Sequence, residues 1–174
     1  MNALETDMIK LRALEPEDVD ILYKWENDTN IWKLSGTVAP FSRYILRRFI
    51  EDQKYDIYET RQMRLIIESK LSASPVGTID LFDIDPYNHR AGVGILVYDH
   101  NDEGQGYASS ALQALIRYSF HILGLNQLYC NILSNNTRSL NLFKSKDFTV
   151  VGLNREWVKT TTDWLDEYML QLIN

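Results

Sequence analysis

The stretch GILVYDHNDEGQGYASSAL, residues 94–112, has the pattern of a strand, a turn and the start of a helix. Gly104 and Gly106 stand where the strand ends and the helix begins. Because glycine has no Cβ, consecutive backbone N–H groups there can close around a phosphate, and the helix N-terminus adds further free N–H groups. The stretch therefore predicts a pyrophosphate-binding loop, with a plain left-handed turn as the alternative.

Hydrophobic patterns on both sides of this stretch predict one mixed sheet. The order β α α β β β α β α β β indicates an α/β (α+β) fold in a single domain, with a mostly antiparallel central sheet flanked by helices. The helix after the glycine turn connects two strands that should be parallel. Residues 34–41 (LSGTVAPF) are expected to form a loop. Strands are expected at 8–14, 64–69, 76–85, 90–98, 127–133, 148–158 and 164–173, and helices at about 16–27, after Ser42, at 107–120 and at 137–146.

Composition excludes several classes of protein. The 174 residues carry 18 Lys and Arg against 24 Asp and Glu, a net charge of −6. Phosphate binding needs an excess of cations, so nucleic acid is not expected as a partner, whereas cationic small substrates are favoured. Cys130 is the single cysteine, which excludes a disulfide scaffold.

Targeting signals are also not expected. The longest apolar stretch, residues 91–98, is far shorter than the roughly 20 residues that a membrane helix needs. Glu5 and Asp7 fall where a signal peptide would have an apolar run. We therefore expect a cytoplasmic protein without a membrane partner.

The glycine turn resembles a motif of the GNAT (GCN5-related) N-acetyltransferases. EGQGYA, residues 103–108, is similar to their acyl-CoA pyrophosphate loop, Gln/Arg-x-x-Gly-x-Gly/Ala. About thirty residues later, NNTRSLNLFKSKDF is similar to the family's second landmark, Asn-x-x-(Ala/Ser)-x-x-Leu-Tyr/Phe-x-x-x-Gly-Phe. The resemblance covers nearly the whole chain and implies one GNAT domain over residues 1–174 with the acyl-CoA N-acyltransferase fold. The second landmark is matched by Asn136, Ser139, Leu142, Phe143 and Phe148.

This resemblance implies acetyl-CoA as the cosubstrate and assigns residues to it. The start of the chain and the strands at 64–98 are most similar to spermidine/diamine and ribosomal-protein N-acetyltransferases. The resemblance implies that Asn136 and Ser139 contact the pantetheine or phosphate region, and that Phe143 lies beside the thioester sulfur. It also implies that the pantetheine pairs with the backbone of Ile95, Leu96 and Val97, and that the pyrophosphate binds the loop residues Glu103, Gly104, Gln105, Gly106, Tyr107, Ala108 and Ser109.

Four positions depart from the family pattern. Glu103 places a carboxylate near the pyrophosphate, and Asp147 replaces a glycine. Phe143 stands where relatives have a tyrosine that protonates the leaving thiolate, and Gly92 stands where many have a glutamate base. A thiol with a pKa of about 8.5 leaves without strong acid help. We expect orientation of the amine, and a strand N–H that polarises the thioester carbonyl, to lower the barrier, with Leu96 as the donor.

Two carboxylates on the strand at 76–85 are candidate proton acceptors or amine ligands. Strand alternation places Asp80 on one face with Thr78 and Phe82, and Asp83 on the other with Ile79 and Leu81. A carboxylate on an apolar face is costly unless it is paired. The alternative is that each is a structural partner of an arginine, Arg64 or Arg90. Glu68, on the neighbouring strand, is a further candidate.

The remaining reactive side chains give weaker signals. Three scattered histidines and Cys130 lack the spacing of metal ligands, so no metal is expected, and Cys130 is expected to be a buried strand residue. Trp32, with Trp25 and Tyr44, can bind a cation on its π face or can simply pack. Trp157 and Trp164 can serve a subunit contact in a homo-oligomer.

Together these observations predict direct transfer of an acetyl group from acetyl-CoA to a primary amine. No side chain in the expected site is placed to form an acyl-enzyme. A small cationic amine or polyamine is the favoured substrate because of the acidic charge balance. A peptide or ribosomal-protein N-terminus is the alternative substrate. Because Phe143 and Gly92 lack the usual groups, an acyl-CoA-binding protein without catalysis is the alternative of another class.

Overall fold

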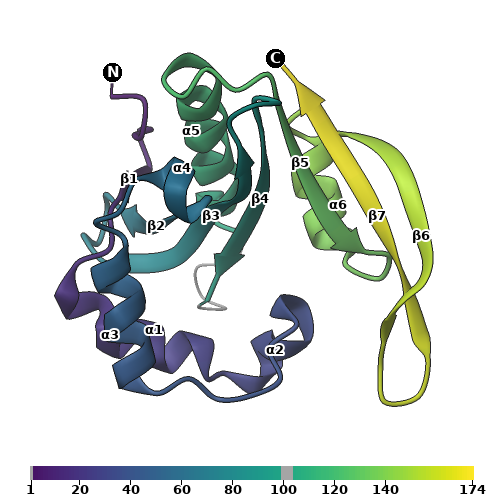
Figure 1. The fold of residues 1–174 in the computed structure, drawn as a ribbon, viewed down its shortest axis with the longest axis horizontal. Coiled ribbons are helices and arrows are strands. Elements are labelled where there is room, and N and C mark those ends of the chain that lie inside the picture. The colour runs from purple at the N-terminus through teal and green to yellow at the C-terminus, as the bar shows by residue number, and fades with distance from the viewer. Residues whose placement is uncertain (1, 99–103) are drawn as a thin grey trace.

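The computed structural model describes residues 2–98 and 104–174, and in these ranges one seven-stranded sheet forms the centre of the fold (Figure 1). The strands lie in the order β1-β2-β3-β4-β5-β7-β6. Neighbours are antiparallel except β4 and β5, which are parallel because a crossover helix connects them. The strands are β1 (Ile9–Arg12), β2 (Gln62–Ser69), β3 (Pro75–Asp85), β4 (Arg90–Val97), β5 (Gln127–Leu133), β6 (Thr149–Lys159) and β7 (Trp164–Ile173).

Helices cover both faces of the first half of the sheet. On β2, Leu65 and Ile67 belong to the core beneath α5, while Ile66 belongs to the core beneath α1 and α3. A strand that alternates between two apolar cores must be buried on both faces. Figure 1 shows α1, α2 and α3 grouped away from α5. The helices are η1 (Pro16–Asp18), α1 (Val19–Glu26), α2 (Thr29–Ser35), α3 (Arg43–Asp52), α4 (Ile57–Thr60), α5 (Tyr107–His121) and α6 (Thr137–Lys144).

The predicted fold class and element order are confirmed, with two additional short helices. α2 begins after Asp28, whose Oδ1 accepts from Asn30 N at 2.9 Å, and ends at Gly36 with a φ of 70°. This helix therefore occupies the first two residues of the predicted loop 34–41. α4 is a single turn capped by Asp56. No helix in the described ranges is both long and apolar enough to cross a membrane.

A bulge in β3 corrects the predicted face of Asp83. Its φ is +48°, and the register between β3 and β4 shifts between Phe82 and Asp85. The extra residue turns Asp83 outward, where it is exposed, and Ile84 is fully buried instead. The prediction that Asp83 shares the face of Ile79 and Leu81 is therefore wrong, because strict alternation does not hold across a bulge.

Candidate active site

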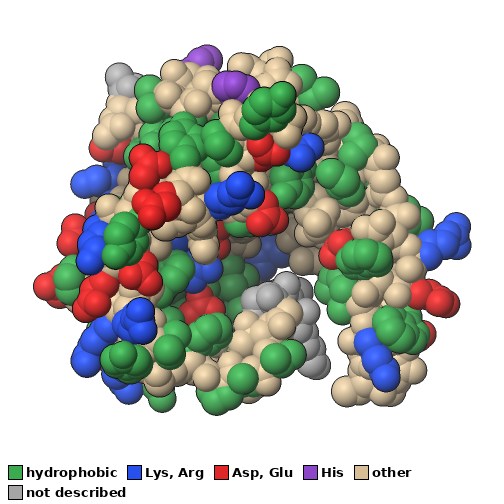
Figure 2. Space-filling model, viewed as in Figure 1, with side chains coloured by type: hydrophobic (Ala, Val, Ile, Leu, Met, Phe, Trp, Pro, Cys, Tyr) green, Lys and Arg blue, Asp and Glu red, His purple; other side chains and the backbone are tan. Residues whose placement is uncertain are grey.

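A cavity of about 510 Å³ lies where β4 and β5 diverge. The two strands are paired only from Arg90 to Gly92 on β4 and from Gln127 to Tyr129 on β5. Beyond that point both strands continue, and residues from each line the cavity, as do side chains of β3, α6 and β7. Figure 2 shows the surface hollowed between the α1–α2 segment and the β6–β7 hairpin.

The backbone of Leu96 faces β3 and not the opening. Tyr98 N donates to Val76 O at 3.1 Å, so alternation along this antiparallel pair makes Leu96 and Thr78 the next hydrogen-bonded pair. The space beside Gly77 agrees, since a Cβ built there would lie 2.2 Å from the carbonyl oxygen of Leu96. The expectation that the Leu96 N–H polarises a thioester carbonyl in the opening therefore does not fit the register.

The opposite residues of β4 face the opening. His89 O accepts from Gln127 N at 3.2 Å, so the odd-numbered residues of this segment turn their backbone groups toward β5. Ile95 and Val97 follow the same alternation and lie beyond the last β4–β5 pair. Their N–H and C=O groups are the ones aimed into the divergence. The candidate donor moves from Leu96 to Ile95.

The glycine turn has the conformation that its composition suggested. Gly104 and Gly106 have φ values of 79° and 89°, which favour glycine, and Gly106 is the N-cap of α5. The first bond within the helix runs from Ser110 N to Gly106 O at 2.9 Å. The backbone N–H groups of the first three residues of the helix, Tyr107, Ala108 and Ser109, therefore have no partner within it. Gln105 is exposed, and Glu103 lies outside the described residues.

Tyr107 contributes to this turn through its backbone alone. Its side chain is buried, and its hydroxyl is 3.1 Å from the buried Ser69 Oγ on β2. This hydrogen bond anchors the first turn of α5 to the sheet. The N-terminus of α5, with its free N–H groups, is thereby fixed against β2, and a helix N-terminus of this kind can bind an anion.

The start of α6 forms another wall of the cavity. Asn136 caps the helix, with its Oδ1 accepting from Ser139 N at 3.1 Å, and both residues line the cavity. Phe143 is buried and packs edge-to-face on Phe148, with ring centroids 5.0 Å apart. Asp147 follows the helix with a φ of 66°, in the left-handed region that favours the glycine of the family pattern.

An arginine joins two carboxylates on the β2–β3 wall of the cavity. Arg64 on β2 donates from Nε and Nη2 to both oxygens of Asp80, at 2.7 and 3.0 Å, and from Nη1 to Glu26 Oε1 at 2.6 Å. Burial alone would lower the pKa of the Arg64 guanidinium, but the charges of Asp80 and Glu26 outweigh burial and raise it. Asp80 therefore has the arginine partner that was the alternative to a catalytic role.

The chain matches the family model described as Acetyltransferase (GNAT) domain over residues 9–149. The chain belongs to the GNAT acetyltransferase family. It is 33% identical to the uncharacterized N-acetyltransferase p20 of Bacillus licheniformis over 99% of this chain and 97% of that protein. It is 23% identical to the spermidine N(1)-acetyltransferase of Escherichia coli K12 over 83% of this chain and 74% of that protein.

Its fold is similar to that of a Vibrio cholerae spermidine N-acetyltransferase, solved in complex with CoA and spermine. The TM-score is 0.86 at 21% identity, covering 97% of this chain and 96% of that one. At this identity the likeness shows the fold. Together with the family membership and the spermidine acetyltransferase relatives, it supports an acetyltransferase enzyme over a non-catalytic acyl-CoA-binding protein.

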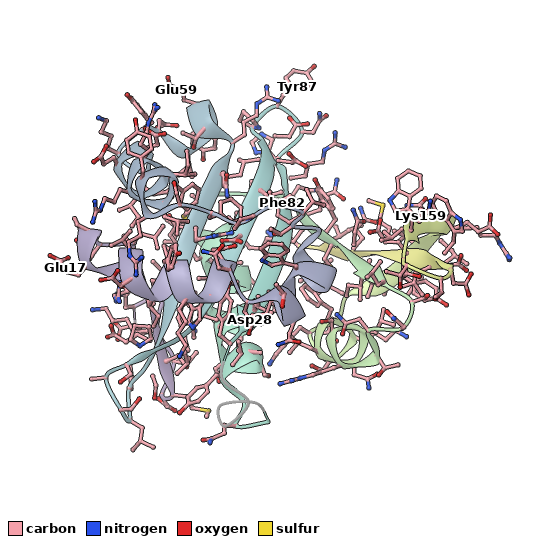
Figure 3. The ribbon with its side chains drawn as sticks, turned by 90° about the horizontal axis from the view of Figure 1, so that it is seen from below. Glu17, Asp28, Glu59, Phe82, Tyr87 and Lys159 are labelled. Carbon is pink, nitrogen blue, oxygen red and sulfur yellow. The ribbon has the colours of Figure 1, made fainter. Side chains whose placement is uncertain are left out.

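In this acetyltransferase, Phe82 fills the space above Gly92. A Cβ built on Gly92 would lie 2.3 Å from Phe82 Cε2, and the ring also reaches within 3.8 Å of a Cβ on Gly94. Figure 3 shows Phe82 near the middle of the sheet, whereas Tyr87 and Lys159 mark its periphery. A longer side chain at position 92 does not fit while this ring is in place. The Phe82 ring therefore excludes a glutamate side chain at position 92.

Three other predicted substrate residues are not among those that line this cavity. Glu68 Oε2 accepts from Arg12 Nε at 2.7 Å on the β1 side of the sheet. Trp32 Nε1 donates to Glu26 O at 2.7 Å, which fixes the indole on α2. Asp83 lines a second hollow of about 530 Å³, together with Arg61 and other polar residues.

Sequence reasoning missed several polar residues that line the cavity, among them Tyr98 and Glu167. Tyr98, just after the end of β4, stacks on Trp25 with ring centroids 4.2 Å apart. Burial and the charge of Glu26 raise the pKa of the Tyr98 phenol. Glu167 enters from β7. Its signal was the alternation with the buried Leu170, but the sequence does not show that β7 borders the divergence.

Proposed function

We propose that this protein transfers the acetyl group of acetyl-CoA to a primary amine of a small cationic amine or polyamine. The observation that carries the proposal is the cavity at the β4–β5 divergence. Backbone groups of β4 border this cavity, and its lining includes three carboxylates (Glu26, Asp80 and Glu167) against one guanidinium, that of Arg64. This excess of negative charge favours a cationic substrate.

Acetyl-CoA would lie along the α5 and α6 side of the divergence. Backbone groups of Ile95 and Val97 would pair with the pantetheine arm. The N–H groups from Gly104 to Ser109 would hold the pyrophosphate, since a helix N-terminus binds anions without cationic side chains. Asn136, Ser139 and Phe143 line the same wall and would contact the pantetheine and the thioester.

The reaction would be a direct attack. The neutral amine nitrogen bonds to the thioester carbonyl carbon while the Ile95 N–H stabilises the developing oxyanion. The C–S bond then breaks, and the thiolate takes the remaining extra proton from nitrogen to leave as CoA thiol. Phe143 has no proton to give, but a thiol of pKa about 8.5 is a good leaving group at neutral pH.

A peptide N-terminus remains the second candidate substrate, and the second hollow favours it. That hollow lies on the same face of β5, where Tyr129 and Gln127 line it and Asn131 lines the main cavity. Phe82, which lines the main cavity, packs edge-to-face against Tyr129, which lines the second hollow, with ring centroids 6.0 Å apart. Peptide residues beyond the first would extend past these two rings into the second hollow.

The expected cytoplasmic location and homo-oligomeric state are further proposals. The β6–β7 hairpin carries the exposed side chains of Val151, Trp157 and Trp164. An exposed apolar surface of this kind is typical of a subunit contact.

Thiol release from acetyl-CoA, followed with a thiol-reactive dye, tests the function. The amines are spermidine, spermine, putrescine, an aminoglycoside, amino sugars and short peptides, and mass spectrometry identifies the acetylated product. Cys130 should not disturb the assay, because it is 1% exposed and burial raises the pKa of its thiol to about 12. We expect release with the polyamines. Release with peptides alone would replace the polyamine proposal by the peptide one.

A further inference from the structure

Some of the charged side chains that line the cavity form ion pairs with one another, and one carboxylate does not take part in these pairs. Arg64, Asp80 and Glu26 form one network in which both oxygens of Asp80 accept from the guanidinium. Glu167 also lines the cavity, but within residues 2–98 and 104–174 its carboxylate makes neither a hydrogen bond nor an ion pair. A half-buried carboxylate without a partner is costly unless a ligand supplies one.

The position of Glu167 follows from the strand register. It lies opposite Leu133 of β5 and on the sheet face that also carries Met169, while the neighbouring Leu170 is buried on the other face. Asn131 and Leu133 line the cavity on the same face of β5. Glu167 therefore approaches the β4–β5 divergence from the β7 side, opposite the Arg64 network.

We infer that Glu167 accepts the proton of the substrate ammonium and so generates the amine that attacks acetyl-CoA. This inference rests on the proposed acetylation of a protonated amine. One N–H bond of R–NH₃⁺ breaks and an O–H bond forms on Glu167. The resulting R–NH₂ attacks the thioester carbonyl carbon, the C–S bond breaks, and the second ammonium proton leaves with the CoA thiol. Glu167 then returns its proton to water.

The other titratable groups that line the cavity are less suited to this role. Asp80 and Glu26 already accept from Arg64, so protonating either would break an ion pair. Tyr98 keeps its proton, because burial and the charge of Glu26 raise the pKa of its phenol. Cys130 is 1% exposed, and burial raises the pKa of its thiol to about 12.

The test is the pH dependence of kcat/KM for Glu167→Gln. Spermidine is the amine probe, or the best peptide if only peptides react. General-base catalysis contributes about 10²–10⁴-fold, so we expect a loss of at least about 100-fold at pH 7. The loss should shrink as pH rises, because the variant depends on free amine from solution, and amines of this type have a pKa of about 10. Below that pKa the fraction of free amine, and with it kcat/KM of the variant, should rise about tenfold per pH unit. The kcat/KM of the wild type should not rise in this way.

Glu156→Gln is the matched control, since it makes the same change at an exposed residue of the adjacent strand β6. We expect it to retain wild-type kcat/KM, and we expect Glu167→Asp to keep the wild-type pH profile at a reduced rate. A loss in Glu167→Gln that stays constant with pH would reduce Glu167 to a packing role and overturn the inference, as would wild-type activity. Turnover of peptides but not polyamines by the wild type would overturn the proposed substrate alone. No turnover of any amine would overturn both.

Discussion

The two walls of the cavity differ in how their charges are used. On the β2–β3 wall, Arg64 is bound to Asp80 and Glu26 through three short hydrogen bonds, and its side chain is 19% exposed. On the β5–β7 wall, Glu167 has no such partner in the part of the chain that the structure describes. Carboxylates line both walls, so residue type alone does not distinguish them. The walls differ in whether the carboxylate oxygens already accept hydrogen bonds from an arginine.

This difference separates stability from reactivity. A paired carboxylate fixes the shape of its wall, because removing one partner leaves an uncompensated charge in a partly buried place. An unpaired carboxylate can gain and lose a proton without disturbing its neighbours. We therefore expect substitutions on the Arg64 wall to change mainly the free energy of unfolding, and substitution of Glu167 to change mainly turnover.

The largest stability effect is expected for Arg64→Met. It leaves Asp80 and Glu26 without their partner, and breaking a buried pair in this way costs about 3 kcal/mol or more. For a domain of this size that corresponds to a fall in Tm of about 6–12 °C. Urea unfolding with a constant m value would measure the loss. Equal Tm values for Arg64→Met and the wild type would contradict the comparison of the two walls.

Arg43→Met is the control for that change. Arg43 pairs with Asp20 at 2.8 Å, but both side chains are exposed, by 49% and 75%. Solvent screens an exposed ion pair, so we expect Arg43→Met to leave the free energy of unfolding almost unchanged. A double-mutant series that adds Asp80→Asn to Arg64→Met should recover part of the loss, since one unpaired charge is then removed.

A smaller effect is expected for Gly92→Ala, which tests the boundary between the walls. The added Cβ would lie 2.3 Å from Phe82 Cε2, so the ring must move. Overpacking of this kind costs about 2 kcal/mol, and Phe82→Ala in the same chain should relieve most of it. The measurement is a double-mutant cycle on the free energy of unfolding. Strict additivity of the two changes would show that Phe82 does not fill this space.

The fold could be predicted largely from local pattern. Alternation of apolar residues identified the strands, and helical spacing identified the longer helices. Gly104 and Gly106 marked the N-terminus of α5, and in the structure both have left-handed φ values. α2 was missed because its cap, Asp28, lies outside any apolar stripe. The bulge at Asp83 was missed because period-2 alternation contains no signal for an inserted residue.

The site could be predicted only in part. Residues carried by a motif, such as Asn136 and Phe143, do line the cavity. Leu96 was assigned the wrong backbone direction, because that direction depends on the hydrogen-bond register with β3. Glu167 was overlooked, since its importance depends on β7 lying next to β5. The pairing of Arg64 with Asp80 was left open for the same reason. Each depends on a contact between strands that are distant in the sequence.

The smallest effect is expected for Asp18→Asn, in a second ion-paired cluster on the β1 side. Burial alone would raise the pKa of the Asp18 carboxyl, but hydrogen bonds from Arg12 at 2.7 Å and from Glu15 N at 2.8 Å outweigh it and hold the pKa below its usual range. Because the folded state binds the proton less readily, this stabilisation is present above the unfolded pKa of about 3.9 and is lost as pH falls below it.

At pH 7 we therefore expect Asp18→Asn to lower the free energy of unfolding by about 1.5 kcal/mol, since charged hydrogen bonds become neutral ones. The difference from the wild type should narrow as pH falls below the unfolded pKa of about 3.9 and through the lower folded pKa, because Asp18 itself becomes protonated. Urea unfolding at a series of pH values measures both curves. Glu68→Gln is a useful companion, because it weakens the same Arg12 from its other side, at 2.7 Å, without touching the cap of η1. A pH-independent difference for Asp18→Asn would contradict this prediction, since it would mean that the charge of the Asp18 carboxylate adds nothing to the free energy of unfolding.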